Sequence, residues 1–455
     1  MADSLIHPEE LAPSNNNTIH RGLPVSSAGQ LGESVRLDNR FLSDNQHGFI
    51  QGRSCTTQLL RVVDRLTEIL DKGGTVDMVY LDFAKAFDSV PHKRLLVKLE
   101  GYGIEGRTLK WIEQFLVGRR QRVGVAGSFS EWADVVSGVP QGSVLGPVLF
   151  VCYINDLPEA ISSIIHMYAD DTKLFRQVDD DIDRKELQDD LDRLASWAHE
   201  WQLKFNVEKC KVMHIGLKNE KIKLTMSDGT KRSELQETEL EKDLGIWFNS
   251  RLTSQDQVTH AVNKANQILG LIRRSFTYMD AQLMKQLFTT MVRPHLEYGN
   301  VVWHPYLRRE IDMIEAVQHR ATKMVPGYSK LSYEQRLRKM KLPSLEYRRF
   351  RGDMIEVYKY THGLYRVDES SLLPRHHDAG MKTRGHCLKL EKREGNTMIR
   401  QNFFGMRIVN RWNALPEKVV SSSSVNVFKG RLDRHCGAEC YGVATRWSVG
   451  QQTAD

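Results

Sequence analysis

Two adjacent carboxylates, Asp170 and Asp171, lie between two apolar segments of the sequence. The segment 164–167 precedes them and Leu174-Phe175 follows, a pattern that predicts two strands joined by an acidic turn. Neighbouring carboxylates repel each other, so the pair needs a cation or water to compensate its charge. For an isolated pair, a solvated aspartate-rich turn is the ordinary interpretation.

Two other stretches favour a catalytic interpretation of this pair. The apolar strand 79–83 delivers Asp82 at its end, and the turn 138–143, rich in glycine and proline, opens an apolar helix. A strand-borne aspartate, a glycine-rich turn and an acidic hairpin, in that order, are the parts of a two-metal nucleotidyl-transfer site. Such ions take oxygen ligands. Asp82 and Asp170 are therefore predicted to be catalytic and to bind two Mg²⁺ ions, or Mn²⁺, with Asp171 as a further ligand or electrostatic partner.

Three further positions near these stretches each have two interpretations. Phe87 could press on the sugar of an incoming nucleotide and exclude a 2′-hydroxyl, or it could be a core residue. Gln141 and Gly142 could contact nucleotide or template, or simply begin a helix. Lys209 could meet a triphosphate, although an exposed lysine is the preferred interpretation.

The composition is that of an ordinary globular protein, and its positive net charge makes a polyanionic partner plausible. The 455 residues can form several subdomains, 40% of them are hydrophobic, and the formal net charge is +7. A basic balance is compatible with nucleic-acid binding but is weak support alone. No signal peptide or transmembrane segment is predicted, and the six scattered cysteines suit reduced thiols in an intracellular compartment.

The order of patterns along the chain predicts an α+β domain followed by helices. Residues 1–44 are a predicted disordered leader. From 45 to 216, strands alternate with helices, including a helix capped by Ser54 and a final strand over 205–215. An acidic run, 179–192, is interpreted as the solvated face of a helix.

The second half of the sequence has a helical pattern. Residues 217–255 are a predicted connector with short strands, and 256–330 a helical region with apolar stripes such as Leu283, Leu287 and Met291. Residues 331–455 form a basic region in which tyrosines and phenylalanines alternate with cations. This region suits a surface that tracks a nucleic-acid backbone. For the aromatic residues alone, burial in a helical core is the preferred interpretation.

Three motifs together resemble the reverse transcriptases of non-LTR (LINE-type) retrotransposons. They are LDFAKAFDSV around Asp82, SGVPQGSVLGPVLF around Gln141 and YADDTKLF around Asp170. NQHGFIQGRSCTTQLL resembles the segment before the first catalytic strand, WQLKFNVEKCKVMHIG the strand after the hairpin, and VRPHLEYGNVVW a downstream region of the jockey-like and chicken-repeat lineages. The resemblance covers about residues 45–435.

The resemblance implies a right-hand polymerase, with palm and partial fingers over 45–216 and a helical thumb-like region at 256–330. It implies that Asp82, Asp170 and Asp171 are the catalytic triad and that Phe87 selects deoxynucleotides. It further implies that Gln141 and Gly142 belong to the nucleotide and template motif. Phe83, Arg53 and Lys209 are also predicted to contact nucleotide or template.

The leading hypothesis is an RNA-directed DNA polymerase acting on an RNA template, a DNA primer and dNTPs. Residues 1–44 do not resemble the family's additional fingers segments, and no endonuclease domain precedes them, so we expect an N-terminally truncated copy. The alternatives are an inactive remnant that only binds nucleic acid and a two-metal nuclease. Because retrotransposons of this family prime DNA synthesis at chromosomal DNA, the resemblance implies a nuclear protein that is synthesised in the cytoplasm. We expect no membrane association and no obligatory protein partner.

Overall fold

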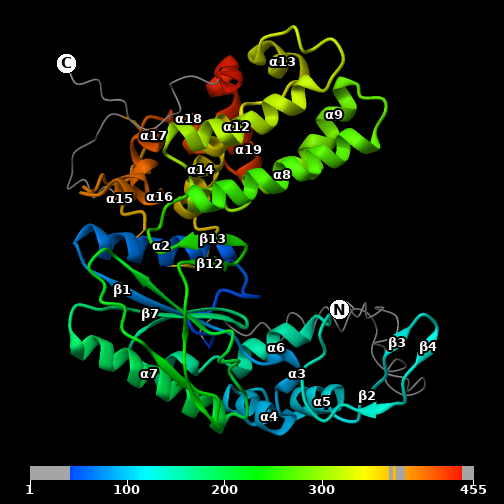
Figure 1. Cartoon of the computed structure of the whole chain (residues 1–455), viewed down its shortest axis with the longest axis vertical. Helices are drawn as coiled ribbons and strands as arrows, with labels where there is room; N and C mark the ends of the chain where they lie inside the picture. Colours follow the sequence, from blue (N-terminus) through cyan, green and yellow to red (C-terminus); the bar gives the residue numbers. More distant parts are fainter. Residues whose placement is uncertain (1–40, 368–371, 376–384, 443–455) are drawn as a thin grey trace. The chain divides into compact units, whose positions relative to one another are not determined.

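The computed structural model describes residues 41–367, 372–375 and 385–442, and the chain folds into two compact units (Figure 1). The first unit holds the residues up to 51 together with 77–212 and 220–237, and the second holds 52–76, 213–219 and the residues from 238 onward. Most of the predicted leader, and the end of the predicted basic C-terminal region, lie outside the described residues. The predicted domain boundaries stay a prediction.

The first unit is built from short helices and strands around one sheet, of which the first residue of β1 and the last three residues of β8 are grouped with the second unit. Its elements are β1 (Val76–Leu81), α3 (Ala86–Ser89), α4 (His92–Gly101), α5 (Gly106–Leu116), β2 (Arg120–Gln121), β3 (Gly124–Val125), β4 (Ser128–Phe129), β5 (Ala133–Asp134), α6 (Leu145–Tyr153), a 3₁₀ turn (Leu157–Ala160), β6 (Ile164–Tyr168), β7 (Asp171–Gln177), α7 (Asp181–Glu200), β8 (Lys211–Ile215), β9 (Thr225–Ser227), β10 (Arg232–Glu234) and β11 (Gln236–Glu237).

The sheet has five strands in the order β11-β8-β1-β7-β6, so β1 lies at its centre. β6 and β7 form an antiparallel hairpin, and β8 pairs in parallel with β11. Apolar side chains of the strands, such as Val79 and Ile165, pack in one core with Leu187 and Leu191 of α7, which lies beside β7 (Figure 1). Helices and strands around a mixed sheet confirm the predicted α+β class.

Two details of the first unit differ from the sequence prediction. The strand predicted over 205–215 covers only β8, because the N–H groups of Lys209 and Cys210 donate to the Asn206 carbonyl and close a turn. The acidic run on α7 is not wholly solvated. Asp190 is completely buried and accepts hydrogen bonds from the N–H groups of Ser162 and Ser163 at 3.1 and 2.8 Å.

The second unit is mainly helical. Its elements are α2 (Cys55–Asp71), β12 (Leu240–Asp243), β13 (Ile246–Asn249), α8 (Gln255–Ser275), α9 (Ala281–Leu287), a π-helical segment (Phe288–Val292), α10 (Arg293–Glu297), α11 (Asn300–Trp303), α12 (Arg308–Lys323), α13 (Tyr333–Met340), α14 (Leu345–Thr361), α15 (Met398–Asn402), α16 (Phe404–Arg407), α17 (Val409–Asn413), α18 (Glu417–Val420), α19 (Val425–Cys436) and a 3₁₀ turn (Gly437–Tyr441).

Local sequence signals explain where several of these helices begin. The Ser54 hydroxyl accepts a hydrogen bond from the Thr57 N–H, and the Thr57 hydroxyl accepts one from the Ser54 N–H. This capping box confirms the predicted start of α2. Of the predicted stripe Leu283, Leu287 and Met291, the two leucines are partly buried against the core, whereas Met291 is exposed. Met284, Phe288 and Val292 are the buried stripe, because two adjacent apolar stripes share this segment and the periodicity does not distinguish them.

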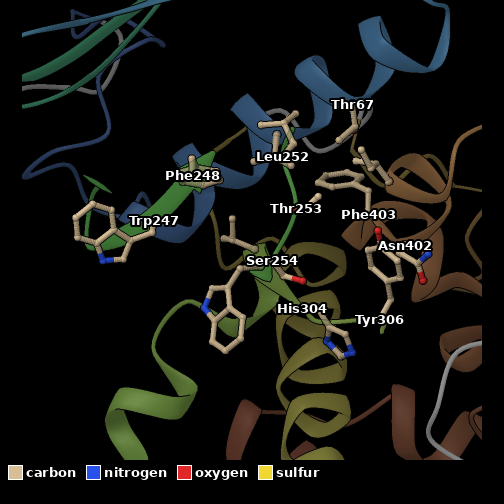
Figure 2. Close-up of a pocket in the computed structure, with 14 residues that line it drawn as sticks. Thr67, Trp247, Phe248, Leu252, Thr253, Ser254, His304, Tyr306, Asn402 and Phe403 are labelled. Carbon is tan, nitrogen blue, oxygen red and sulfur yellow. The ribbon is translucent and has the colours of Figure 1, made fainter. Parts of the chain in front are cut away.

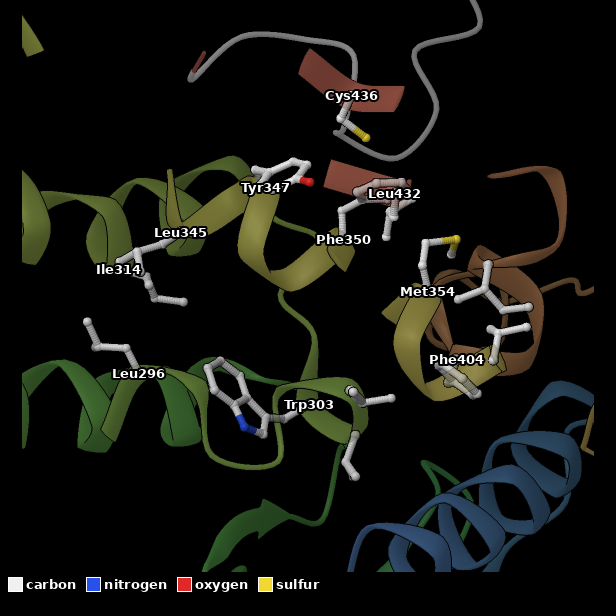
Figure 3. Packing of buried hydrophobic residues seen from close by; sticks show 14 of the residues in the cluster. Leu296, Trp303, Ile314, Leu345, Tyr347, Phe350, Met354, Phe404, Leu432 and Cys436 are labelled. Atoms are coloured by element: carbon white, nitrogen blue, oxygen red, sulfur yellow. The ribbon is translucent and has the colours of Figure 1, made fainter. Parts of the chain in front are cut away.

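The aromatic residues of the basic region are core residues. Tyr347, Phe350 and Tyr358 of α14 are each at most 3% exposed, and Tyr347 and Phe350 lie close to Leu432 of α19 (Figure 3). The interpretation of these side chains as buried is therefore confirmed. Among the described residues, no helix has the length and apolar character needed to cross a membrane.

Candidate active site

Asp82 directly follows β1, the central strand of the sheet. The segment after α7 fixes its main chain, because the Asn206 N–H donates to the Asp82 carbonyl at 2.7 Å and the Asp82 N–H donates to Cys210 Sγ at 3.4 Å. Burial raises the pKa of Cys210 to about 11, so this thiol stays neutral near pH 7. The Asp82 side chain remains 45% exposed and is accessible to a ligand from solvent.

Asp170 lies at the tip of the β6–β7 hairpin. Tyr168 pairs with Asp171, which leaves Ala169 and Asp170 as the two loop residues and confirms the predicted acidic turn. Ala169 has a φ of 55° and is buried. This left-handed conformation costs an alanine roughly 1–2 kcal/mol. The turn presents the side chains of Asp170 and Asp171 to solvent.

The two aspartates interact electrostatically. Partial burial raises the pKa of Asp170, and the negative charge of Asp82 raises it further. The ammonium group of Lys209, which is 69% exposed, lies 3.6 Å from Asp82 Oδ2 and offsets part of this charge. The structure thus brings the strand-end aspartate and the hairpin aspartate close enough to repel each other.

The carboxylates fit a divalent cation by charge and ligand type. They supply hard oxygen donors, and their mutual repulsion would be relieved by a cation. Within the described ranges, no three His, Cys, Asp or Glu side chains are gathered into a group that could hold a metal. Asp82 and Asp170 are thus an electrostatically coupled pair, with Asp171 adjacent at the first position of β7.

The glycine-rich turn packs on the segment that follows Asp82. A Cβ on Gly138 (φ 89°) would lie 2.7 Å from the Asp88 Cα, so this close contact requires glycine. The Val139 N–H donates to the Phe87 carbonyl at 2.8 Å, and Arg119 donates to the Gly138 carbonyl at 2.6 Å. The Val139 bond connects the turn, and through it α6, to α3, the helix that follows β1 and Asp82.

The other predicted residues of this turn are accessible. Gln141 and Gly142 are both exposed. Gly142 has a φ of 84°, and no atom lies within 4 Å of the Cβ position it lacks. The backbone at this point can therefore be approached closely by a ligand.

The predicted aromatic residues differ in exposure. Phe83 is 5% exposed and stacks on Phe205 with the ring centroids 4.4 Å apart, so its ring belongs to the core. Phe87 is only partly buried and stacks on Phe150 of α6, with the ring centroids 4.7 Å apart.

Arg53, another predicted contact residue, lies in the second unit, where its Nε donates to the Arg366 carbonyl at 3.2 Å.

The second unit contains a pocket of a different chemical character (Figure 2). Aromatic and hydroxyl or amide side chains line it, among them Trp247, Phe248, Ser254, Tyr306 and Asn402. None of its lining residues is a carboxylate. The pocket therefore lacks the groups that nucleotidyl transfer requires, and the coupled aspartates are the better candidate site.

Sequence reasoning did not identify the groups that fix the site's backbone. Asn206 and Cys210 hold Asp82 across more than a hundred residues of sequence, and His92 and Arg119 hold the Gly138 carbonyl. Contacts between residues so far apart in the sequence produce no periodic pattern from which they could be predicted. The basic cluster around Arg119 was visible in the sequence, but its contact with the turn was not.

Comparison with known proteins gives three kinds of similarity. A sequence model of the family "Reverse transcriptase (RNA-dependent DNA polymerase)" matches residues 31–264. The chain is 28% identical over 315 residues to the probable RNA-directed DNA polymerase from transposon BS of Drosophila melanogaster, covering 64% of this chain and 33% of that protein. It is 28% identical over 327 residues to the RNA-directed DNA polymerase from mobile element jockey of Drosophila funebris, covering 67% and 35%.

Among solved structures, similarity extends to telomerase from Candida albicans, with 9% identity, a TM-score of 0.37 and coverage of 67% of this chain and 55% of that one. The chain spans about a third of the length of the polymerase relatives named above. The family match covers half of the chain and includes Asp82, Gln141 and Asp170. By this match, the chain belongs to the reverse transcriptase family.

Proposed function

We propose that this chain is an RNA-directed DNA polymerase, which adds deoxynucleotides to a DNA 3′-hydroxyl opposite an RNA template. The observation that carries the proposal is the placement of two carboxylates on neighbouring strands of one sheet: Asp82 directly follows β1, and Asp170 directly precedes β7. Family membership supports the class of reaction. The names of the relatives support an RNA template.

Asp82, Asp170 and Asp171 would hold two Mg²⁺ ions, with Mn²⁺ as an alternative. When bound, such ions activate the 3′-hydroxyl and stabilise the charge of the leaving pyrophosphate. The protein's own contribution is positioning: the Asn206 and Cys210 contacts fix the main chain of Asp82, and the tight turn aims Asp170.

The surrounding residues are proposed to bind nucleotide and template. Phe87 retains an exposed part of its ring beside the catalytic strand, where it would contact the nucleotide sugar. The open backbone at Gln141 and Gly142 would approach the base pair being formed. Lys209 would meet a phosphate, exchanging its contact with Asp82 for one with the substrate. Roles for Phe83 and Arg53 are structural in this account: Phe83 supports Asp82 from the core, and Arg53 binds a backbone carbonyl.

A primer-extension assay tests the proposal. Purified chain is given a DNA primer annealed to an RNA template, Mg²⁺ and dNTPs, and Asp170→Ala is compared with wild type. The matched control is Glu113→Ala, which removes an exposed carboxylate from α5 in the same unit. We expect extension by wild type and by the control, strong preference for dNTPs over rNTPs, and loss of extension in Asp170→Ala.

The alternatives make different predictions in the same assay. A protein that only binds nucleic acid would retain the hybrid without extending it. A two-metal nuclease would cleave the hybrid in a metal-dependent manner without using dNTPs. Either result with folded wild-type protein would overturn the proposed activity. In cells we expect the chain in the nucleus, which immunofluorescence of the tagged protein would check.

A further inference from the structure

Residues 45–48, with the sequence Asn-Gln-His-Gly, pair with the outer strand of the catalytic hairpin. The Met167 N–H donates to the Asn45 carbonyl and the His47 N–H donates to the Met167 carbonyl, both at 2.8 Å. Gln46 thereby forms a parallel bridge with Met167 of β6. This segment therefore extends the sheet beside the strand that leads into Asp170.

The Gln46 side chain reaches from this segment into the catalytic turn. It is completely buried, and its Oε1 accepts two hydrogen bonds, from the Gly48 N–H at 2.7 Å and from the Ala169 N–H at 2.9 Å. Ala169 is the residue with the left-handed φ, and it immediately precedes Asp170. A buried N–H needs an acceptor, and Gln46 supplies it at the position where the turn is most strained.

Gly48 allows this approach. A Cβ built on Gly48 would lie 2.5 Å from the Ala169 nitrogen and 2.9 Å from the Tyr168 carbonyl carbon. Side chains do not approach backbone atoms so closely, so any larger residue would push the segment and the turn apart. The Gln46 hydrogen bond to Ala169 and the close packing of Gly48 thus both require the backbone of residues 45–48 to lie close to the backbone of the Ala169 turn.

We propose that Gln46 and Gly48 form a clamp on the Ala169 turn, and that Gln46 is a positioning residue for Asp170. The clamp holds an alanine in a conformation that it would otherwise leave, and it thereby sets the direction of the neighbouring carboxylate. The positioning role rests on the proposed function, because it matters only if Asp170 takes part in nucleotidyl transfer. The clamp itself does not depend on activity.

Hydrogen exchange tests the clamp independently of catalysis. Wild type, Gln46→Leu and Gln58→Leu are compared by exchange of the peptide that spans β6 and β7. Gln58 is a matched control, because it is equally buried and its side-chain amide has no hydrogen-bond partner among the described residues. We expect exchange at the Ala169 turn to be at least about tenfold faster in Gln46→Leu and unchanged in Gln58→Leu. Equal protection in all three proteins would overturn the clamp.

Kinetics test the positioning role. At saturating dNTP, Gln46→Leu should lower kcat of primer extension about ten- to hundredfold, while the KM for dNTP and the affinity for the hybrid change less than about threefold. Ala169→Gly should reduce this loss when combined with Gln46→Leu, since glycine adopts the turn conformation without the clamp. A residue that merely stabilises the fold would instead lower the active fraction, with no rescue by Ala169→Gly.

The outcomes separate the two claims. If wild type does not extend the primer, the proposed function fails, and the exchange experiment still decides whether the clamp exists. If extension is normal in Gln46→Leu while exchange is accelerated, the clamp stands and the positioning role is refuted. If the thermal transition shows that Gln46→Leu does not fold, Gly48→Ala replaces it in the hydrogen-exchange and primer-extension experiments, with the same expected results.

Discussion

At the residue scale, the site contains two carboxylates, Asp82 and Asp170, whose negative charges repel each other when no cation is bound. Asp82 and Asp170 are accessible to solvent, while hydrogen bonds fix the main chain of Asp82 and of Ala169, the residue before Asp170. Partial burial raises the pKa of Asp170, and the negative charge of Asp82 adds to that rise. Such a pair favours a cation between its members, and it gives the site a measurable signature in metal-free protein.

That signature predicts the effect of neutralising one partner. In metal-free protein, Asp82→Asn should lower the pKa of Asp170, because loss of the neighbouring negative charge favours the ionised form. The pKa should stay above its ordinary value, since partial burial of Asp170 is unchanged. Carbon-detected NMR titration of the aspartate carboxyls measures this shift, with Glu113→Gln as the control. An unaltered Asp170 titration would show that the two groups do not interact.

Lys98 is a second residue whose charge is set by its surroundings. It is buried, donates to the Tyr153 carbonyl and to Asp156 at 2.6 Å, and lies 3.7 Å from the Trp201 ring centroid. Burial is the main cause that lowers its pKa from 10.5 to about 8, against the opposing effect of Asp156. The folded state therefore loses this proton at a lower pH than the unfolded state does.

The sign of the resulting pH dependence follows directly. Between pH 8 and 10.5 the unfolded state binds more protons at Lys98, so this group's contribution to the free energy of unfolding rises with pH. Relative to Lys98→Met, wild type should gain about 3 kcal/mol from pH 7 to 10.5. Urea unfolding of both proteins, followed by tryptophan fluorescence, gives this difference. Parallel pH profiles would mean that Lys98 titrates normally.

At the element scale, the glycine-rich turn joins α6 to the segment after β1. Gly138 makes this junction possible because its missing Cβ would overlap the Asp88 backbone. Gly127 offers a matched comparison, since its φ of 85° is similar but no atom lies within 4 Å of its Cβ position. Gly127→Ala should cost about 1 kcal/mol, the strain of the left-handed backbone alone. Gly138→Ala should cost about 1–3 kcal/mol more.

Chemical unfolding of both glycine variants measures these costs. Equal destabilisation would show that the Asp88 segment moves away freely and that the turn is not fixed to it. A larger cost in Gly138→Ala, together with impaired primer extension, would tie the packing of this turn to the site.

Elements with local signals were predictable from the sequence, and contacts between distant segments were not. The capping box of Ser54 and the apolar flanks of Asp170 are encoded within a few residues, so the helix start and the acidic hairpin were predicted correctly. Asp190 has the charge pattern of a surface residue, but Ser162 and Ser163 supply its buried hydrogen bonds from 28 and 27 residues away. The Gln46 contact with Ala169 spans 123 residues, and no periodicity encodes it.

At the scale of the whole molecule, the chain has two units with separate cores, and the second contains buried charges. The Arg407 side chain is 2% exposed, and two of its nitrogens donate to Asp353 at 3.0 and 2.7 Å, with a further bond to the Val301 carbonyl. A buried carboxylate that loses its partner is strongly destabilising. Loss of Arg407 alone would therefore leave the Asp353 carboxylate without its main partner in the core of the second unit.

Removing that partner should destabilise the second unit selectively. Arg407→Met is expected to cost about 3–5 kcal/mol. The control, Arg338→Met, breaks an exposed pair with Glu334 on α13 and should cost at most about 1 kcal/mol. Hydrogen exchange resolved by peptide distinguishes the units: faster exchange is expected in α14 and α16, with β1 and β7 unchanged. Similar losses in both variants would contradict the account of the buried pair.

The central claim is that Asp82 and Asp170 act together in nucleotidyl transfer, and single-turnover incorporation of one dNTP on an RNA–DNA hybrid tests it most directly. Wild type, Asp82→Ala, Asp170→Ala and the double variant are compared at saturating hybrid, with Glu113→Ala as the control. We expect each single variant to lose at least about 10³-fold in rate and the double variant to lose no more, because groups that act as a unit are not additive. Hybrid binding should be unchanged in all of them. Substantial incorporation by either single variant would contradict the claim.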